Sequence, residues 1–141
     1  LHTCAIMQDG TVRCWGCNVS GQLGDGGAVS TLSAVAVAGL SGQAVSLAAG
    51  DLHTCARMAD GGVKCWGENA SGQLGDGTTA TTAIPVPVVG LGGEASGVFA
   101  GSRFTCATLA AGGVKCWGDN SGGQIGNGEA AWLLAPGASV K

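Results

Sequence analysis

The stretch at residues 53–77 occurs in three copies and constrains the fold more than any other feature of the chain. It joins an apolar segment, a glycine-containing turn, a Cys-Trp-Gly triplet and a glycine-rich tail. Cys14, Cys65 and Cys116 recur at intervals of 51 residues, and so do the tryptophans that follow them. Such a period is typical of solenoids and propellers, which repeat one supersecondary unit. The sequence therefore predicts a single repeat array with three repeats, at approximately residues 1–39, 40–90 and 91–141.

The composition indicates an all-β chain and argues against two classes of partner. The 28 glycines and the lack of a long charged helical pattern favour strands joined by tight turns. Only 11% of the residues are charged, so either further repeats or subunits cover much of the surface, or hydroxyl and amide side chains supply its polarity. A net charge of -3 with six basic residues provides no electrostatic footprint for nucleic acid or an anionic membrane surface.

The uncharged run at residues 26–50 is long enough to raise the question of a membrane span, for which about 20 apolar residues suffice. Serine, threonine, glycine and glutamine interrupt this run, and its counterpart in the second repeat contains Pro85 and Pro87. We therefore expect no membrane span. The chain opens at Leu1 without a signal segment, so we expect a processed product or an excerpt.

Each repeat predicts a β-hairpin, and the three hairpins are expected at residues 2–16, 53–67 and 104–118. Asp9-Gly10 between apolar runs is a strong hairpin signal. A two-residue loop would place Cys4 opposite Trp15, whereas a three-residue loop with a left-handed Gly10 places Cys4 opposite Cys14. We prefer the second register because it aligns a cysteine pair in every hairpin.

Two linking segments connect the three hairpins. Each begins with alternating valines, such as Val35 and Val37, and ends in a short strand of small residues, expected at residues 45–49 and 97–100. Small side chains suit a crowded position near a propeller axis, so we expect these strands there. The third repeat departs late: the run 132–134 replaces polar residues, and Gly137 and Ser139 replace valines. If copies of the chain assemble head-to-tail, we expect Trp132-Leu133-Leu134 to be buried in the contact between them.

The sequence from Cys65 to Thr78, with the segment 86–91, resembles the regulator of chromosome condensation repeat family. The matching motifs are Cys-Trp-Gly-Glu-Asn, Ser-Gly-Gln-Leu-Gly-Asp-Gly-Thr and Val-Pro-Val-Val-Gly-Leu. The resemblance covers nearly the whole chain and implies a β-propeller of four-stranded blades, usually seven, with the last blade often completed by a strand from one terminus. The namesake is an exchange factor for a small nuclear GTPase and acts through an inserted wedge, which this chain lacks. Three blades are too few for a closed ring.

Six of the seven cysteines form regular pairs, and we predict the disulfides Cys4–Cys14, Cys55–Cys65 and Cys106–Cys116. In the preferred register the paired Cα atoms lie about 4.5 to 5.5 Å apart, which a disulfide can bridge. The alternative is that these are buried free thiols that act as small apolar residues. Disulfides predict an oxidising compartment, hence a secreted or cell-surface protein. Cysteines in both hairpin strands resemble a secreted, bacterial branch of the family.

Cys17 is the seventh cysteine and has no counterpart in the other repeats, where Glu68 and Asp119 occupy its position. It forms a C-x-x-C pattern with Cys14, but it lacks the strand-to-helix context of a redox motif. A metal cluster of His2, Cys4, Cys14 and Cys17 is one interpretation, although we prefer a diverged repeat position. A free thiol or an intermolecular disulfide through Cys17 stays open.

The remaining polar positions favour packing and turns over catalysis. Phe104 occupies the position of His2 and His53, so this position tolerates an aromatic residue. Solvated side-chain tips are the expectation for the basic residues beside the repeated tryptophans, which are Arg13, Lys64 and Lys115. The Gly-Asp-Gly elements occur once per repeat, whereas calcium-binding turn repeats need them about every nine residues. No nucleophile with a base, paired carboxylates or phosphate loop is visible.

We therefore predict a non-enzymatic extracellular scaffold that binds a protein partner through loops on a propeller face, with no cofactor, no metal and no catalytic residue. One alternative is a structural subunit that assembles head-to-tail with copies of itself into a filament or ring. Another alternative is an enzyme whose loop site is not recognisable in a single sequence.

Overall fold

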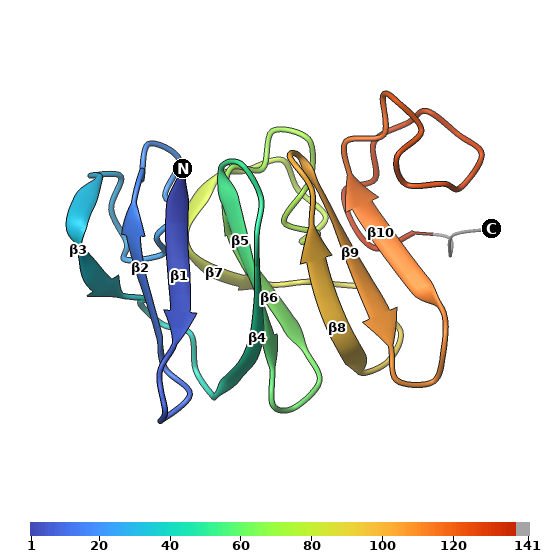
Figure 1. The fold of residues 1–141 in the computed structure, drawn as a ribbon. Coiled ribbons are helices and arrows are strands. Elements are labelled where there is room, and N and C mark those ends of the chain that lie inside the picture. Colours follow the sequence, from blue (N-terminus) through green and yellow to red (C-terminus); the bar gives the residue numbers. More distant parts are fainter. Residues whose placement is uncertain (138–141) are drawn as a thin grey trace.

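The computed structural model describes residues 1–137, which form a row of three antiparallel β-sheets without a helix (Figure 1). We call the sheets blades 1, 2 and 3. Blade 1 contains β1 (His2–Ile6), β2 (Val12–Gly16) and β3 (Thr31–Ala36). Blade 2 contains β4 (Ala44–Ala49), β5 (His53–Met58), β6 (Val63–Gly67) and β7 (Thr82–Pro87). Blade 3 contains β8 (Ala95–Ala100), β9 (Phe104–Leu109) and β10 (Val114–Gly118).

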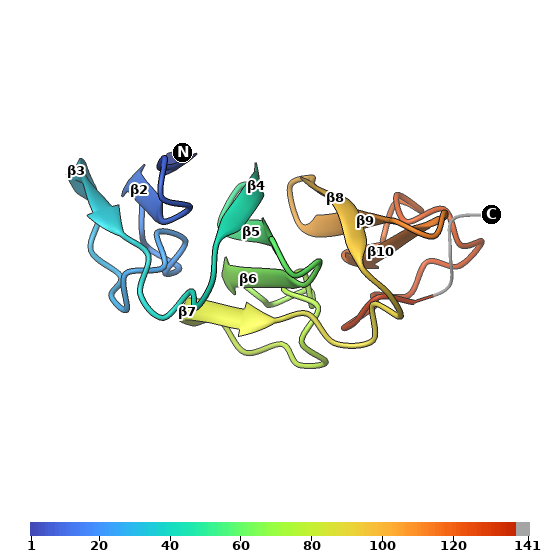
Figure 2. The same cartoon turned by 90° about the horizontal axis from the view of Figure 1, so that it is seen from below.

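Seen from below, the blades follow an arc in which β4 and β8 lie on one edge and β7 on the opposite edge (Figure 2). This arrangement confirms the predicted all-β, propeller-type array. Each sheet falls within one of the three predicted repeats, whose limits stay a prediction. Ser139 and the end of the third repeat at Lys141 lie outside the described residues.

The hairpin register follows from a three-residue loop closed by a left-handed glycine. Gly10 has a φ of 80°, and the Met7 N–H donates to the carbonyl of Thr11 over 2.8 Å. Cys4 consequently lies opposite Cys14, and the same pairing recurs in blades 2 and 3. A side chain at Gly10 would be strained because this φ disfavours residues with a Cβ atom. The preferred register is confirmed.

The blades differ in how many strands they contain. Only blade 2 has four strands, because β4 provides an inner strand and β7 an outer one. In blade 3 a single bridge between Gly118 and Leu133 takes the position that Thr82 holds beside Gly67. Leu133 packs against the core between blades 2 and 3, whereas Trp132 is 51% exposed. Leu133 therefore packs within the chain, whereas burial of Trp132-Leu133-Leu134 between copies of the chain stays a prediction.

The core lies between the blades, in two clusters. One cluster joins blades 1 and 2 around Leu23 and Trp66, and the other joins blades 2 and 3 around Leu74 and Trp117. All four side chains are fully buried. Because each cluster draws its residues from two neighbouring repeats, a single blade cannot bury its own apolar face, as is typical of repeat proteins.

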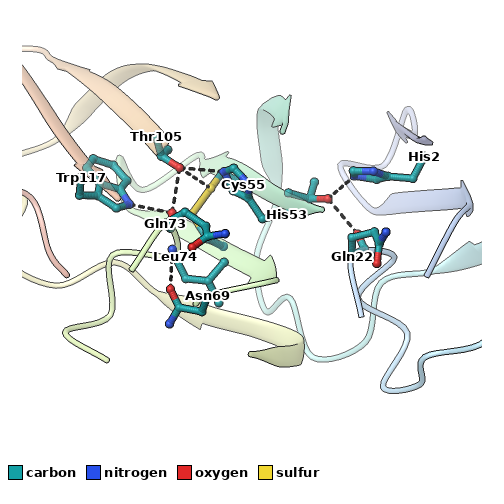
Figure 3. The surroundings of a disulfide bond; sticks show 11 residues. His2, Gln22, His53, Cys55, Asn69, Gln73, Leu74, Thr105 and Trp117 are labelled. Carbon is teal, nitrogen blue, oxygen red and sulfur yellow. Dashed lines mark hydrogen bonds between the residues drawn. A yellow bond between two sulfur atoms is a disulfide. The ribbon is translucent and has the colours of Figure 1, made fainter. Parts of the chain in front are cut away.

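Backbone carbonyls connect neighbouring blades through two buried donors each. The carbonyl of Gln73 accepts the Thr105 hydroxyl at 2.8 Å and the Trp117 indole N–H at 3.0 Å (Figure 3). The carbonyl of Gln22 is bound in the same way by Thr54 and Trp66, at 2.8 and 2.9 Å. These bonds satisfy polar groups that would otherwise be unpaired inside the core.

A histidine completes each of these interfaces. His53 Nε2 lies 2.9 Å from the Thr105 hydroxyl. Because Thr105 donates its only proton to Gln73, His53 must donate through Nε2 and leave Nδ1 unprotonated. That Nδ1 atom is buried and has no partner among the described residues. Burial lowers the pKa of His53 to about 4, with a smaller contribution from His2 in the same direction.

Two of the lysine tips that were expected to be solvated also contact main-chain carbonyls. Lys64 Nζ donates to the carbonyl of Leu40 over 2.6 Å, and Lys115 Nζ donates to the carbonyl of Gly90 over 3.3 Å. Both carbonyls belong to the segments that cross from one blade to the next. The long lysine side chains thus reach these crossovers while their stems cover the sheet.

Candidate binding face

The longest loops of the molecule lie together along one side of the row of blades, where the strands end. This side contains Leu1, the turns at residues 50–52 and 101–103, and the loops at residues 17–30, 68–81 and 119–131, which lie toward the top of Figure 1. We call this side the loop face. The opposite side of the row, which we call the hairpin face, contains the hairpin turns and the crossovers between blades. Loops supported by rigid strands are the usual position of binding residues.

A buried asparagine shapes each long loop. Asn69 Nδ2 donates to Asp76 Oδ1 at 3.1 Å and to the carbonyls of Thr78 and Ala80 at 3.1 and 3.2 Å. Its Oδ1 accepts the Leu74 N–H at 3.0 Å. Asn18 and Asn120 hold their loops through equivalent bonds. Every polar atom of the Asn69 side chain is therefore used to fold the loop, and none is presented to a ligand.

A glutamine and a leucine anchor the same loop to the core. Gln73 Oε1 accepts the Ser71 N–H at 2.9 Å, and Gln73 Nε2 donates to Glu68 Oε2 at 3.1 Å. The neighbouring Leu74 is fully buried between blades 2 and 3. Since the loop is fixed at both its polar and its apolar residues, its tips are held in a defined position.

The tips of these loops are small or apolar and exposed. Val19 and Val29 of the first repeat are 66% and 78% exposed, and Ala70 and Ala80 are exposed at the equivalent positions of the second repeat. Nearby, Leu1, Asp51 and Leu52 line a hollow. Exposed valines on a rigid loop provide apolar contact area that the fold itself does not use.

The loop face is acidic. Its turns and loops contain a single basic side chain, Arg103, and six carboxylates, which are Asp25, Asp51, Glu68, Asp76, Asp119 and Glu129. The hairpin turns and crossovers contain three carboxylates, Asp9, Asp60 and Glu94, and the ammonium groups of Lys64 and Lys115 reach the crossovers from the strands. A hydrogen bond from the Ser121 N–H lowers the pKa of Asp119, so this carboxylate keeps its charge in mildly acidic solution.

The predicted site residues are placed as follows. The structure joins Cys4–Cys14, Cys55–Cys65 and Cys106–Cys116 in disulfides with Cα separations of 4.0 to 4.1 Å. Three disulfides are consistent with an oxidising compartment. Cys17 is a free, half-buried thiol on the loop face. The role of its thiol stays a prediction.

The structure gives no support to the metal interpretation at the first hairpin. Cys4 and Cys14 are bonded to each other, and His2 Nε2 lies 2.7 Å from the Thr54 hydroxyl. Among residues 1–137, no three His, Cys, Asp or Glu side chains gather as metal ligands would. These residues also contain no helix long and apolar enough to cross a membrane.

Sequence reasoning missed the two groups that organise the loops and interfaces. One is the buried asparagine, and the other is the glutamine whose carbonyl receives the next blade. Both recur in every repeat, at Asn18 and Gln22 in the first. A polar residue that recurs at the same place in each repeat was the available signal, because repeated burial demands repeated hydrogen bonding.

Comparisons with known proteins agree with this architecture. A family model described as the regulator of chromosome condensation (RCC1) repeat matches residues 1–22, 44–73 and 96–124, more than half of the chain, and a second RCC1 repeat model matches residues 60–108. The chain belongs to the RCC1 repeat family. No comparison places it in the secreted, bacterial branch.

Curated relatives with RCC1-type sequence similarity are much longer than this chain. The human E3 ubiquitin-protein ligase HERC2 is 34% identical over 135 residues, which are 90% of this chain and 3% of HERC2. The ultraviolet-B receptor UVR8 of Arabidopsis thaliana is 33% identical over 137 residues, which are 96% of this chain and 31% of UVR8. The chain thus spans less than a third of either relative.

Solved structures share the fold. Yeast RCC1 (Prp20), crystallised with Kap60, superimposes with a TM-score of 0.85 at 21% identity, covering 99% of this chain and 35% of that one. The entire ectodomain of the Physcomitrella patens receptor kinase CR4 superimposes with a TM-score of 0.56 at 25% identity, covering 86% of this chain and 28% of that one. This chain is therefore part of a propeller-type repeat array.

Proposed function

We propose that the chain is a protein-binding scaffold that recognises its partner with the loop face. The observation that carries this proposal is the loop frame of the first two repeats, in which buried Asn, Gln and Leu side chains fix exposed tips. The third repeat keeps the buried Asn120 and has the buried Ile125 in place of the leucine. A pre-shaped loop loses little conformational entropy on binding, which favours affinity. Yeast RCC1 bound to Kap60 is an example of a similar array that binds a protein.

The chemistry of the loop face indicates what kind of partner it fits. Val19 and Val29 offer apolar contact area on the loop of blade 1, and the carboxylates of all three loops make the face negative. A partner surface with exposed apolar side chains and a basic border is complementary to this arrangement. Such binding should weaken as salt is raised, because the carboxylates are exposed.

The proposal includes an extracellular position. Three disulfides support it, since such bonds persist in oxidising compartments. The similarity to the ectodomain of receptor kinase CR4 is a second argument. We further propose the secreted, bacterial branch of the family, on the ground that both strands of each hairpin carry cysteine.

Introduction of positive charge on one face at a time tests the proposal. Val19→Arg with Val29→Arg alters the loop face, and Met7→Arg with Ala59→Arg is a matched control that adds the same charge to exposed positions of the hairpin face. Each protein is immobilised, cross-linked to secreted proteins of the source organism and analysed by mass spectrometry. We expect one partner that the wild type and the control capture and that the loop-face variant loses.

Equal capture by both variants would contradict the use of the loop face. Loss of capture by the control alone would move the interface to the hairpin face. Circular dichroism of both variants shows whether they are folded, so an unfolded variant is not mistaken for a loss of contact.

A second candidate function is head-to-tail assembly with copies of the chain. In blades 2 and 3, a threonine and a tryptophan donate hydrogen bonds to the preceding blade, as Thr54 and Trp66 do to Gln22. The equivalent residues of blade 1, Thr3 and Trp15, have no acceptor among the described residues. At the other end, Gln124 is exposed and its carbonyl corresponds to those of Gln22 and Gln73. Analytical ultracentrifugation tests this proposal: we expect large assemblies of the purified chain, and a folded monomer at micromolar concentration would overturn it.

A further inference from the structure

Asn127 occupies the position of an aspartate in the other two repeats. Asp76 Oδ1 accepts the Asn69 side-chain amide at 3.1 Å and the Thr78 N–H at 3.0 Å. Asn127 Oδ1 accepts the equivalent donors, from Asn120 at 3.2 Å and Glu129 at 3.0 Å. The third loop thus keeps the hydrogen bonds of the carboxylate loops while an amide replaces the carboxylate.

The glycine that follows this position differs in its backbone bonding. Gly26 N–H donates to the carbonyl of Ala83 at 3.0 Å, and Gly77 N–H donates to the carbonyl of Leu134 at 2.9 Å. In both cases the acceptor belongs to the next blade. Gly128 N–H has no acceptor among residues 1–137, and Gly128 is exposed. Within the described part of the chain, Gly128 is therefore the one of these three glycines whose backbone nitrogen is not held by a hydrogen bond.

We propose that Asn127 is a site of spontaneous deamidation, and that the third loop is thereby converted to the aspartate form of the first two. The Gly128 nitrogen loses its proton and forms a bond to Asn127 Cγ. The bond from Cγ to Nδ2 then breaks, and ammonia leaves with that proton. Water opens the resulting cyclic imide, so the net change is consumption of one water molecule and release of one ammonia.

The hydrogen bonds of the loop also make Asn127 Cγ, the atom that is attacked, more reactive. Two N–H donors on Asn127 Oδ1 withdraw electrons from Cγ and stabilise the negative charge that develops on this oxygen during attack, as an oxyanion hole does. The bond from Glu129 N–H to Oδ1 curls the side chain over the intervening Gly128 peptide. Gly128 also lacks a Cβ atom that would obstruct ring closure.

The product with a normal peptide bond fits the fold. Asp25 shows that a carboxylate is accepted at this position, because its Oδ1 binds the same two donors, Asn18 Nδ2 at 3.1 Å and Gly27 N–H at 3.0 Å. The iso-aspartyl product adds one atom to the main chain and displaces Glu129 N–H from the turn. The folded loop should therefore favour the aspartate product.

Coverage of blade 3 should control the reaction. Any element that packs on this blade as blade 3 packs on blade 2 supplies Gly128 N–H with a carbonyl, as Leu134 does for Gly77. The nitrogen is then held away from Cγ. Asn127 is consequently modified only while this face is open.

Peptide mapping of the purified chain during incubation in mildly alkaline buffer tests the proposal. The other asparagines, Asn18, Asn69 and Asn120, are internal controls, because they are buried as Asn127 is but are followed by residues other than glycine. We expect loss of the amide at Asn127 with the other three intact, and aspartate as the main product. The variant Asn127→Asp should fold as the wild type does and show no further mass change.

Hydrogen exchange tests separately whether the Gly128 N–H lacks a hydrogen-bond acceptor. The Gly128 amide should exchange faster than those of Gly26 and Gly77. Protection of Gly128 equal to theirs would overturn the open nitrogen, retention of Asn127 would overturn the deamidation site, and equal loss at all four asparagines would overturn its selectivity.

Discussion

The two interfaces between blades and the outer faces of blades 1 and 3 are built from the same repeat positions. The residues at these positions differ, however, in burial and in hydrogen bonding. Trp66 and Trp117 are fully buried and donate to a carbonyl of the preceding blade. Trp15 is half-buried and has no acceptor among the described residues. The comparison teaches that the repeated sequence encodes the interface between blades rather than the single blade. A repeated residue therefore provides its full stabilisation only where a neighbouring blade packs against it.

The outer face of blade 3 also differs in chemistry from the equivalent face of blade 2. Phe104 stands where His53 donates to Thr105, and Phe99, 58% exposed, stands where Ala48 packs against the core. This face can no longer donate the histidine hydrogen bond. It therefore presents an apolar ring at the position from which His53 donates in blade 2.

Truncation of the repeated tryptophan should give the largest difference in stability between a position in an interface and the equivalent position on an outer face. Trp66→Ala removes a buried ring and its hydrogen bond to Gln22, and such changes cost about 3 to 5 kcal/mol. Trp15→Ala removes the same group from an open face and should cost far less. Urea unfolding of both variants measures the difference. Equal losses would show that the tryptophan stabilises its own blade and not the interface.

Acid should weaken the interface between blades 2 and 3 through His53. Its pKa is about 4 in the folded chain, below the ordinary value of 6.5, so the unfolded chain binds a proton between these values and the folded chain does not. Stability is therefore lost as the pH falls from about 6.5 to about 4, by about 3 kcal/mol.

His53→Phe is the control that the chain itself suggests. The ring of Phe104 lies against Gly101 as the ring of His53 lies against Gly50, so phenylalanine fits this position. We expect the variant to lose less stability than the wild type when unfolding is compared at neutral and acidic pH. Parallel losses in the two proteins would assign the acid sensitivity to other groups.

The sequence could predict the hairpins, their register and the cysteine pairing, because the period, the Asp9-Gly10 turn and the paired cysteines constrain one another. It could not predict the hydrogen bond between Thr105 and Gln73, since the two residues come from different repeats and meet only in the packed array. It also could not place Leu133, because an irregular segment has no periodic pattern and is positioned by the blade beside it.

The threonine bridge should show the same contrast on a smaller scale. Thr105→Val leaves the Nε2–H of His53 without an acceptor and takes one donor from the Gln73 carbonyl, which should cost about 1 to 3 kcal/mol. Thr3→Val at the open face of blade 1 should be nearly neutral, because Thr3 is exposed. Thermal unfolding of the pair is the measurement, and a neutral Thr105→Val would remove the bridge from the account of interface stability.

The smallest effect concerns Cys17 and can increase stability. In the second repeat Glu68 accepts a hydrogen bond from Gln73 Nε2 at 3.1 Å. In the first repeat Cys17 stands at that position, and the buried Nε2 of Gln22 has no partner within residues 1–137. Cys17→Glu should supply the missing acceptor and stabilise the chain by about 0.5 to 1.5 kcal/mol. Cys17→Ser removes the thiol without reaching Gln22 and should change stability by less than about 0.5 kcal/mol. Urea unfolding under non-reducing conditions compares the two variants. Equal stability of both would mean that Gln22 finds its partner elsewhere and that the difference between the first two loops has no energetic consequence.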